Sequence, residues 1–378
     1  MDFTKLTDFL DSIPNLGVPG VDCIVQQGYE TIYRHQAGFS DREAQIPMRG
    51  DEAFYLYSSS KPITCTAVLQ LYEQGKLLLT DPLSNYIPEF RNMQVQHQRG
   101  NGEMILLPAR REITIANLMS MTAGLNYDLD SPAIQEVAQR TQGRYPTVEV
   151  ARALGSQPLC YEPGTRWQYS LAHDVLGAVV EIVSGMRFGE YLRQNLFEPL
   201  GMVNTRFAHS NDLPANMMPQ YVRNNTTGEV TLIGPANAYI LGSEYESGGA
   251  GLVSTLADYS KFLAAMANGG VSAEGVRILS QNTIDLMRLN QLSGTQMEDF
   301  DWPQFAGYGY GLGVRTMVDP ARGGANSPLG EFGWAGAAGT YLLIDPQNKI
   351  SMFYVQHMRE SLESYIHPRL RNVLYGCL

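Results

Sequence analysis

The sequence has little that could build a metal site or a disulfide framework. It contains 4 cysteines in 378 residues, and no two of them stand at the spacing of a metal-binding or redox motif. Its 6 histidines lack paired ligand spacing such as His-Glu-x-x-His. These residues are Cys23, Cys65, Cys160, Cys377, His35, His97, His173, His209, His357 and His367. We therefore expect buried free thiols, no metal, no cofactor and no zinc-dependent hydrolysis.

The sequence also contains few charged residues, and its net charge is negative, which disfavours binding to phosphate groups. Charged residues make up 17% of the chain, and the formal net charge is -11. Affinity for nucleic acid or an anionic membrane surface depends on clustered Lys and Arg. The composition therefore disfavours both partners and favours a small-molecule substrate, and it leaves the oligomeric state open.

Long apolar runs are absent, so no segment is predicted to span a bilayer. Residues 1–10 have the pattern of an amphipathic helix with acidic residues inside it, and they lack the basic and then apolar layout of a signal peptide. The chain as given is predicted to be cytoplasmic, and a trimmed leader stays an alternative.

Several common catalytic motifs are missing as well. The sequence contains no Gly-x-Ser-x-Gly nucleophile elbow and no Walker A loop. The glycine-rich segment 248–251 lacks the Lys-Ser/Thr ending of a phosphate-binding loop. A Ser-His-Asp triad of the α/β-hydrolase type and a nucleotide-binding site are therefore disfavoured.

The hydrophobic pattern places strands at both ends of the chain and helices between them. Residues 21–26 and 31–35 read as a hairpin, and strands return at 339–345 and 350–355. Helical spacing or helix boundaries mark 62–79, 115–119, 173–183, 255–268 and 362–375. We expect an α/β (α+β) fold in which an antiparallel sheet, assembled from residues 1–57 and 300–378, is flanked by helices. A mostly helical region, 58–299, is inserted, and the active site lies at the seam of one catalytic unit.

Ser58 and Lys61 form the strongest candidate for a nucleophile and its base. A spacing of three places both side chains on one helix face, and the helix N-terminus favours developing negative charge. Burial would lower the pKa of Lys61, which could then accept the proton of Ser58. The alternative is that Ser-x-x-Lys arises by chance and that Ser58 followed by Pro62 is ordinary helix-start sequence.

Five blocks in order resemble the serine β-lactamase-like superfamily of the class C and penicillin-binding-protein type. This group includes class C β-lactamases, D-Ala-D-Ala carboxypeptidases, D-amino-acid peptidases and the family VIII carboxylesterases. The blocks are 57–64, 113–125, 163–170, 247–255 and 333–336, and the similarity extends over nearly the whole chain. The resemblance implies the β-lactamase/transpeptidase fold and acyl-enzyme chemistry.

The resemblance also implies roles for individual residues. The second motif of the family falls on residues 169–171, so Tyr169 would share a proton with Lys61 as general base and then act as general acid. The third motif falls on 334–336, which we expect on an edge strand. The backbone N–H groups of Ser58 and Ala337 would form the oxyanion hole. The alternatives are that Tyr169 is one of 21 tyrosines packing a core and that Trp334 is an apolar edge residue.

Two departures from the family pattern bear on the substrate. Where the lactamases carry an amide and a cation, this sequence has Leu171 and Trp334. We expect Leu171, Trp334 and Gly336 to contact the substrate, with apolar groups favouring an ester over a β-lactam. The predicted function is ester hydrolysis, with weak β-lactam hydrolysis persisting. A β-lactamase, a D-amino-acid peptidase or carboxypeptidase, an acyltransferase and a non-catalytic penicillin-binding sensor are the alternatives.

Overall fold

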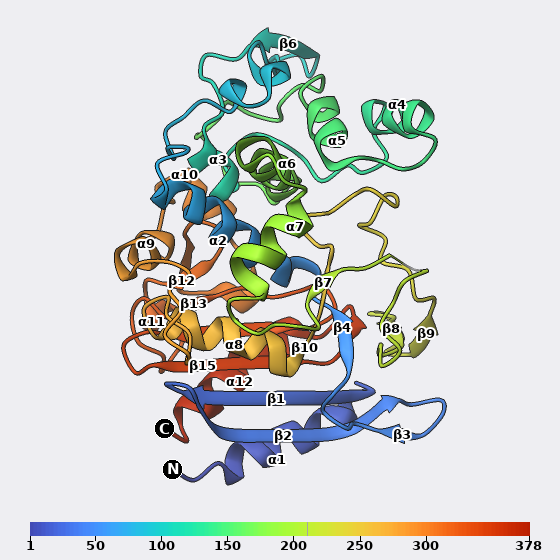
Figure 1. Cartoon of the computed structure of the whole chain (residues 1–378), viewed down its shortest axis with the longest axis vertical. Coiled ribbons are helices and arrows are strands. Elements are labelled where there is room, and N and C mark those ends of the chain that lie inside the picture. The colour runs from blue at the N-terminus through green and yellow to red at the C-terminus, as the bar shows by residue number, and fades with distance from the viewer. Residues whose placement is uncertain (210) are drawn as a thin grey trace.

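The computed structural model describes residues 1–209 and 211–378. Figure 1 shows a large sheet in the lower half of the molecule and a group of helices above it. The sheet has eight strands in the order β11-β12-β13-β14-β15-β1-β2-β3, and all neighbouring strands are antiparallel. The predicted mixed fold with an antiparallel sheet is confirmed.

The two ends of the chain meet in the middle of this sheet. β1 (Gly20–Gln27) pairs on one side with β2 (Glu30–Asp41) and on the other with β15 (Ile350–Val355). β14 (Tyr341–Asp345) continues the sheet beyond β15, and β3 (Ile46–Pro47) ends it beyond β2. The predicted hairpin and the assembly of the sheet from both termini are therefore confirmed.

The expectation that Trp334 belongs to an edge strand is wrong. Trp334 directly follows β13 (Phe332–Gly333), which lies inside the sheet between β12 (Arg315–Met317) and β14. β11 (Tyr308–Tyr310) forms the edge beyond β12. Strands of two or three residues are too short to show a period-two pattern in the sequence, so these outer strands gave no signal.

Helices cover the sheet. α8 (Leu256–Ala267) packs on β1, β14 and β15, although it lies within the range expected to form the helical region. Its buried Tyr259, Phe262 and Met266 recur at helical spacing, as a core-facing stripe requires. α1 (Thr4–Ser12) contacts β2 and α12 (Glu363–Tyr375).

The helical region is centred on α2 (Ser60–Glu73), which packs against α6 (Ala172–Ser184). α2 is buried around its circumference from Ser60 to Leu71, which explains why it lacks a polar face. α2 ends six residues before the predicted end at Leu79. The further helices are α3 (Ile115–Met119), α4 (Pro132–Thr141), α5 (Thr147–Leu154), α7 (Phe188–Leu192), α9 (Gln281–Met287), α10 (Thr295–Asp299) and α11 (Pro320–Gly323).

Smaller sheets complete the fold. They are formed by β4 (Ala53–Tyr55), β10 (Leu252–Thr255) and β7 (Arg206–Phe207); by β16 (Met358–Arg359), β8 (Gln220–Arg223) and β9 (Val230–Ile233); and by β5 (Gln94–Gln98) with β6 (Met104–Pro108). β4 leads directly into the segment that carries Ser58, and its pairing with β10 fixes where that segment leaves the sheet.

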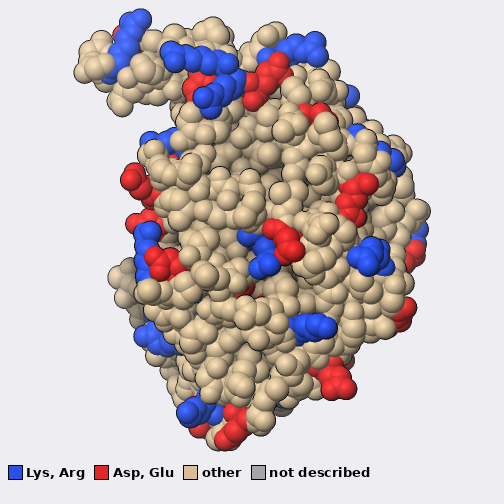
Figure 2. Space-filling model, turned by 90° about the vertical axis from the view of Figure 1, so that its left-hand side faces the viewer, with Lys and Arg blue, Asp and Glu red and all other residues tan. Residues whose placement is uncertain are grey.

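The surface agrees with the composition, and the expectation of buried free thiols is met at three of the four cysteines and is wrong for Cys160. Acidic and basic side chains are interspersed over the face in Figure 2, with no large patch of one sign. Of the four free thiols, Cys160 is partly exposed and the others are buried. Across residues 1–209 and 211–378, no helix has the length and apolar character needed to cross a membrane, and no cluster of His, Cys, Asp and Glu is arranged to hold a metal ion.

Candidate active site

Ser58 lies in a single 3-10 turn, Tyr57–Ser59, that leads into α2. The preceding residue, Tyr57, has a φ of 46°, a left-handed conformation that a bulky side chain rarely adopts. Its side chain is buried, and its hydroxyl hydrogen-bonds the Gln220 side chain, which holds the turn in place. Strain of this kind concentrates at functional sites, and here it presents Ser58 to a pocket.

Lys61 lies one turn further along α2 and is fully buried. Its Nζ is 3.2 Å from Ser58 Oγ and donates a hydrogen bond of 2.8 Å to the Gly249 carbonyl. Burial lowers the pKa of Lys61 to about 7, and the nearby Asp174 carboxylate opposes this shift only in part. A substantial fraction of Lys61 is therefore neutral near pH 7 and able to accept a proton.

The glycine-rich segment 248–251 contacts this lysine and is therefore part of the site. A Cβ on Gly249 would lie 2.6 Å from a carboxylate oxygen of Asp174, so only glycine fits between Asp174 and Lys61. The other oxygen of Asp174 accepts hydrogen bonds from Ser247 at 2.6 Å and Tyr245 at 2.9 Å. The sequence marked this segment as a family block, yet nothing in it pointed to Asp174.

Tyr169 also lies close to Lys61, whose Nζ is 4.4 Å from the centre of the tyrosine ring. Trp334 Nε1 donates a hydrogen bond of 3.3 Å to the Tyr169 hydroxyl. Burial raises the pKa of Tyr169, although the side chains of Ser58 and Trp334 act against the shift. The phenol therefore keeps its proton near neutral pH, which favours donation rather than acceptance of a proton.

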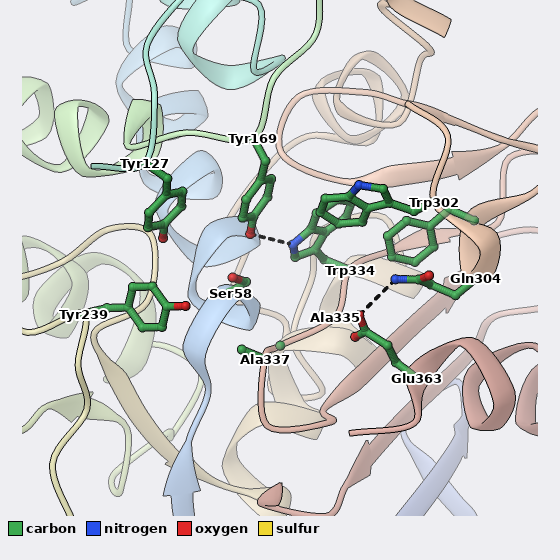
Figure 3. A pocket seen from close by; sticks show the side chains of 12 residues that line it. Ser58, Tyr127, Tyr169, Tyr239, Trp302, Gln304, Trp334, Ala335, Ala337 and Glu363 are labelled. Carbon is green, nitrogen blue, oxygen red and sulfur yellow. Dashed lines mark hydrogen bonds between the residues drawn. The ribbon is translucent and has the colours of Figure 1, made fainter. Parts of the chain in front are cut away.

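These groups open onto a cavity of about 400 Å³ with largely aromatic walls. In Figure 3, Ser58 lies between Tyr127 and Tyr239 on one side and Trp334 and Trp302 on the other. The lining residues are Ser58, Tyr127, Tyr169, Tyr239, Trp302, Gln304, Phe305, Trp334, Ala335, Gly336, Ala337 and Glu363. The cavity has the size and the apolar character of a small-molecule site.

The structure brings most of the predicted site residues together. Ser58, Tyr169, Trp334, Gly336 and Ala337 line the cavity, and Lys61 reaches Ser58 from the core, as the 3.2 Å distance shows. A Cβ on Gly336 would lie 2.3 Å from the Leu56 carbonyl, so glycine lets the segment between β13 and β14 approach the segment that carries Ser58. Throughout residues 1–209 and 211–378, the Ala337 N–H has no hydrogen-bond acceptor, which leaves it available to a ligand.

Leu171 does not line this cavity. Its side chain is only 1% exposed and belongs to the core at the start of α6. A residue two positions after Tyr169 points into the core here because the chain turns into the helix at that point. We therefore leave Leu171 out of the proposed substrate contacts.

Sequence reasoning missed half of the lining. The unexpected residues are Tyr127, Tyr239, Trp302, Gln304, Phe305 and Glu363. They come from loops, from the 3-10 turn Pro303–Phe305 and from the start of α12, and no motif spacing connects them. The one available signal was that Tyr127 follows closely on the block at 113–125.

A serine beside a buried, partly neutral lysine and a protonated tyrosine is the arrangement that serine hydrolases use to form a serine acyl intermediate.

Comparison with known proteins also indicates a serine hydrolase. A family model described as Beta-lactamase matches residues 6–372. Esterase EstB of Burkholderia gladioli is 31% identical over 379 residues, which cover 94% of this chain and 91% of EstB. Protein Rv1367c of Mycobacterium tuberculosis is 31% identical over 347 residues, 89% of this chain and 86% of that protein.

A solved structure also resembles this chain over nearly its whole length. EstCE1, described as a hydrolase with promiscuous acyltransferase activity, is similar over 99% of this chain and 98% of its own, with a TM-score of 0.78 and 26% identity. The chain belongs to the Beta-lactamase family, and it is a serine hydrolase. The resemblance drawn from the five sequence blocks is thereby confirmed.

Proposed function

We propose that the protein hydrolyses carboxylic esters through an acyl-enzyme on Ser58. Neutral Lys61 accepts the proton of Ser58 as its Oγ attacks the ester carbonyl. The N–H groups of Ser58 and Ala337 stabilise the resulting oxyanion. Tyr169 then donates a proton to the leaving alcohol. Attack of water on the acyl group releases the acid and restores Ser58.

One observation carries this proposal: the 3.2 Å contact between Ser58 Oγ and the buried Lys61 Nζ, at the wall of a cavity with aromatic walls. A serine needs a neighbouring base at neutral pH, and burial lowers the pKa of Lys61 to about 7, which makes it such a base. In a purely structural role, a lysine with no carboxylate in contact would be an expensive residue to bury.

The lining of the cavity favours esters over β-lactams. β-Lactam substrates carry a carboxylate, and none of the described lining residues is a lysine or an arginine. Among the described lining residues, the one that can carry a carboxylate is Glu363, which repels a substrate carboxylate when it is ionised. EstB, which is 31% identical to this chain, is named as an esterase.

Acyl transfer to an alcohol is the second candidate. EstCE1 is described as a hydrolase with promiscuous acyltransferase activity. An aromatic cavity can bind an alcohol close to the acyl-enzyme, where the alcohol competes with water for the same intermediate. The ratio of transfer to hydrolysis in the presence of added alcohol measures this activity.

We also propose that the sheet region, 1–57 and 300–378, and the region 58–299 act as one catalytic unit. The cavity takes Ser58, Tyr127, Tyr169 and Tyr239 from the second region. It takes Trp302, Trp334 and Glu363 from the first. Neither region alone would carry a complete site.

The test is turnover of a short-chain p-nitrophenyl ester by the wild type and by Ser58→Ala. We expect the substitution to lower kcat/KM by roughly 10³-fold or more, as loss of a nucleophile does. Ser59→Ala is the matched control, because Ser59 Oγ hydrogen-bonds Thr340 at 2.7 Å instead of Lys61. Unchanged turnover in Ser58→Ala contradicts the proposal, and nitrocefin hydrolysis faster than ester hydrolysis contradicts the choice of substrate.

A further inference from the structure

One end of the cavity carries a carboxyl group that the proposed reaction does not use. Glu363 is the first residue of α12 and is partly buried. Gln304 Nε2 donates a hydrogen bond of 3.0 Å to Glu363 Oε1. Figure 3 shows this pair on the Trp334 side of Ser58, away from Tyr127 and Tyr239.

Among the described residues, Glu363 has no positively charged partner. Over the part of the chain that the structure describes, no Lys, Arg or His forms an ion pair with it, and the other lining residues are uncharged. Burial raises the pKa of Glu363 to about 7, and the nearby Glu360 carboxylate adds to the shift. A cation bound in the cavity would stabilise the ionised form of Glu363, which burial and the Glu360 carboxylate both disfavour.

Aromatic rings line the same cavity as this carboxyl group. Trp302, Phe305 and Trp334 all line the cavity and pack on one another, with ring centres 5.2 to 6.0 Å apart. Indole and phenyl faces attract cations through the ring quadrupole, most strongly where water is excluded. A carboxylate beside such faces is a combination that recognises ammonium groups.

A structural role for Glu363 explains less. Negative charge at a helix N-terminus is favourable, and one hydrogen bond to Gln304 could serve to join α12 to the loop before β11. Neither role requires the carboxyl group to face the cavity that holds Ser58, and a solvated position would serve the helix without the burial that raises the pKa of Glu363.

Resting on the proposed ester hydrolysis, we propose that Glu363 selects esters that carry a cationic ammonium group. The ammonium group binds between the Glu363 carboxylate and the partly exposed ring of Trp302, while the ester carbonyl lies at Ser58. The same carboxylate disfavours substrates that carry a carboxylate of their own. Glu363 is thus a specificity-determining residue.

The test compares cationic esters with neutral twins of the same shape. One pair is acetylcholine and 3,3-dimethylbutyl acetate, which places the charge on the alcohol. The other is the p-nitrophenyl ester of 4-trimethylammoniobutyrate and that of 5,5-dimethylhexanoate, which places it on the acyl group. At about pH 8, where Glu363 is mostly ionised, we expect kcat/KM to favour the cationic member of at least one pair by about tenfold.

The preference must depend on Glu363 itself. In Glu363→Gln, we expect the ratio of cationic to neutral kcat/KM to fall to within about twofold of unity. Glu360→Gln is the matched control, because it removes the same charge three residues away, where Glu360 bonds Asn225 and does not line the cavity. Its ratio should stay near that of the wild type. The proposal is overturned if neither cationic ester is preferred, if the preference survives in Glu363→Gln, or if Glu360→Gln abolishes it equally.

Binding to Ser58→Ala gives a readout that needs no turnover and no stable Glu363 variant. Calorimetric titration with the two pairs should show tighter binding of a cationic member, and equal or weaker binding overturns the proposal. If the wild type hydrolyses no ester yet Ser58→Ala binds the cationic ester more tightly, the ester-hydrolase proposal fails while the selectivity for cations stands. If the wild type hydrolyses esters without any preference for the cationic member of either pair, the ester-hydrolase proposal stands and the selectivity for cations fails.

Discussion

Replacing Lys61 with methionine should abolish catalysis and yet stabilise the protein at neutral pH. Lys61 is completely buried, and burial lowers its pKa from the ordinary 10.5 to about 7. The folded state therefore binds this proton less tightly than the unfolded state does. Between those two pKa values the unfolded chain carries more protons, so the stability of the wild type rises with pH. Methionine fills a similar space and carries no charge, so it escapes the penalty.

The size of the effect follows from the two pKa values. The proton-linked penalty on the wild type is about 4 kcal/mol at pH 7 and falls to about 1 kcal/mol at pH 9.5. Methionine also leaves the buried Gly249 carbonyl without the Lys61 hydrogen bond, a loss of about 1–3 kcal/mol that does not depend on pH. The variant should therefore be more stable than the wild type by about 2 kcal/mol at pH 7, and this advantage should have disappeared by pH 9.5.

Urea unfolding of both proteins at the two pH values measures this directly. Other titrating groups are common to both proteins, so they cancel in the difference. Lys76→Met is the matched control, because Lys76 is exposed beyond the end of α2 and the same change there should show little dependence on pH. A stability difference between Lys61→Met and the wild type that stays constant from pH 7 to pH 9.5 would refute the argument that Lys61 is desolvated.

Three further predictions follow from the site and the core. The kcat/KM for a neutral ester should rise with pH and level off above about pH 7, as Lys61 loses its proton with a pKa of about 7; a profile flat from pH 5.5 to 8.5 would contradict Lys61 as the base. Tyr169→Phe should lower kcat by roughly 10²-fold or more while the protein stays folded by circular dichroism, because only a hydroxyl is lost. Arg315→Leu should lower the free energy of unfolding by about 3–5 kcal/mol, since it leaves the fully buried Glu331 without its partner at 3.0 Å. Arg99→Leu, in an exposed ion pair, should change it by less than about 1 kcal/mol in the same urea titration.

Local patterns in the sequence predicted the parts of the fold that are long and regular. The strands β1, β14 and β15 and the helices α6, α8 and α12 all appear within about two residues of where the hydrophobic periodicity put them, whereas β2 begins as predicted but extends six residues beyond the predicted end. These elements bury one face or lie in the core, so the pattern of apolar residues records their structure. Elements of two or three residues are too short to show a periodic pattern. For this reason β11, β12 and β13 were not predicted, and Trp334 was expected on an edge strand.

The sequence by itself determined the Ser58-x-x-Lys61 pair, because a spacing of three on a helix fixes the distance between the two side chains. It also determined the family, because five blocks in a fixed order are rarely met by chance. Tertiary structure alone decided how completely Lys61 is shielded from water and which hydrogen-bond partners surround it. It also decided that Leu171 lies in the core. It also decided that Trp302, Gln304 and Glu363 share a cavity with Ser58. Burial and long-range proximity arise from how distant segments pack, so no local pattern of residues could specify them.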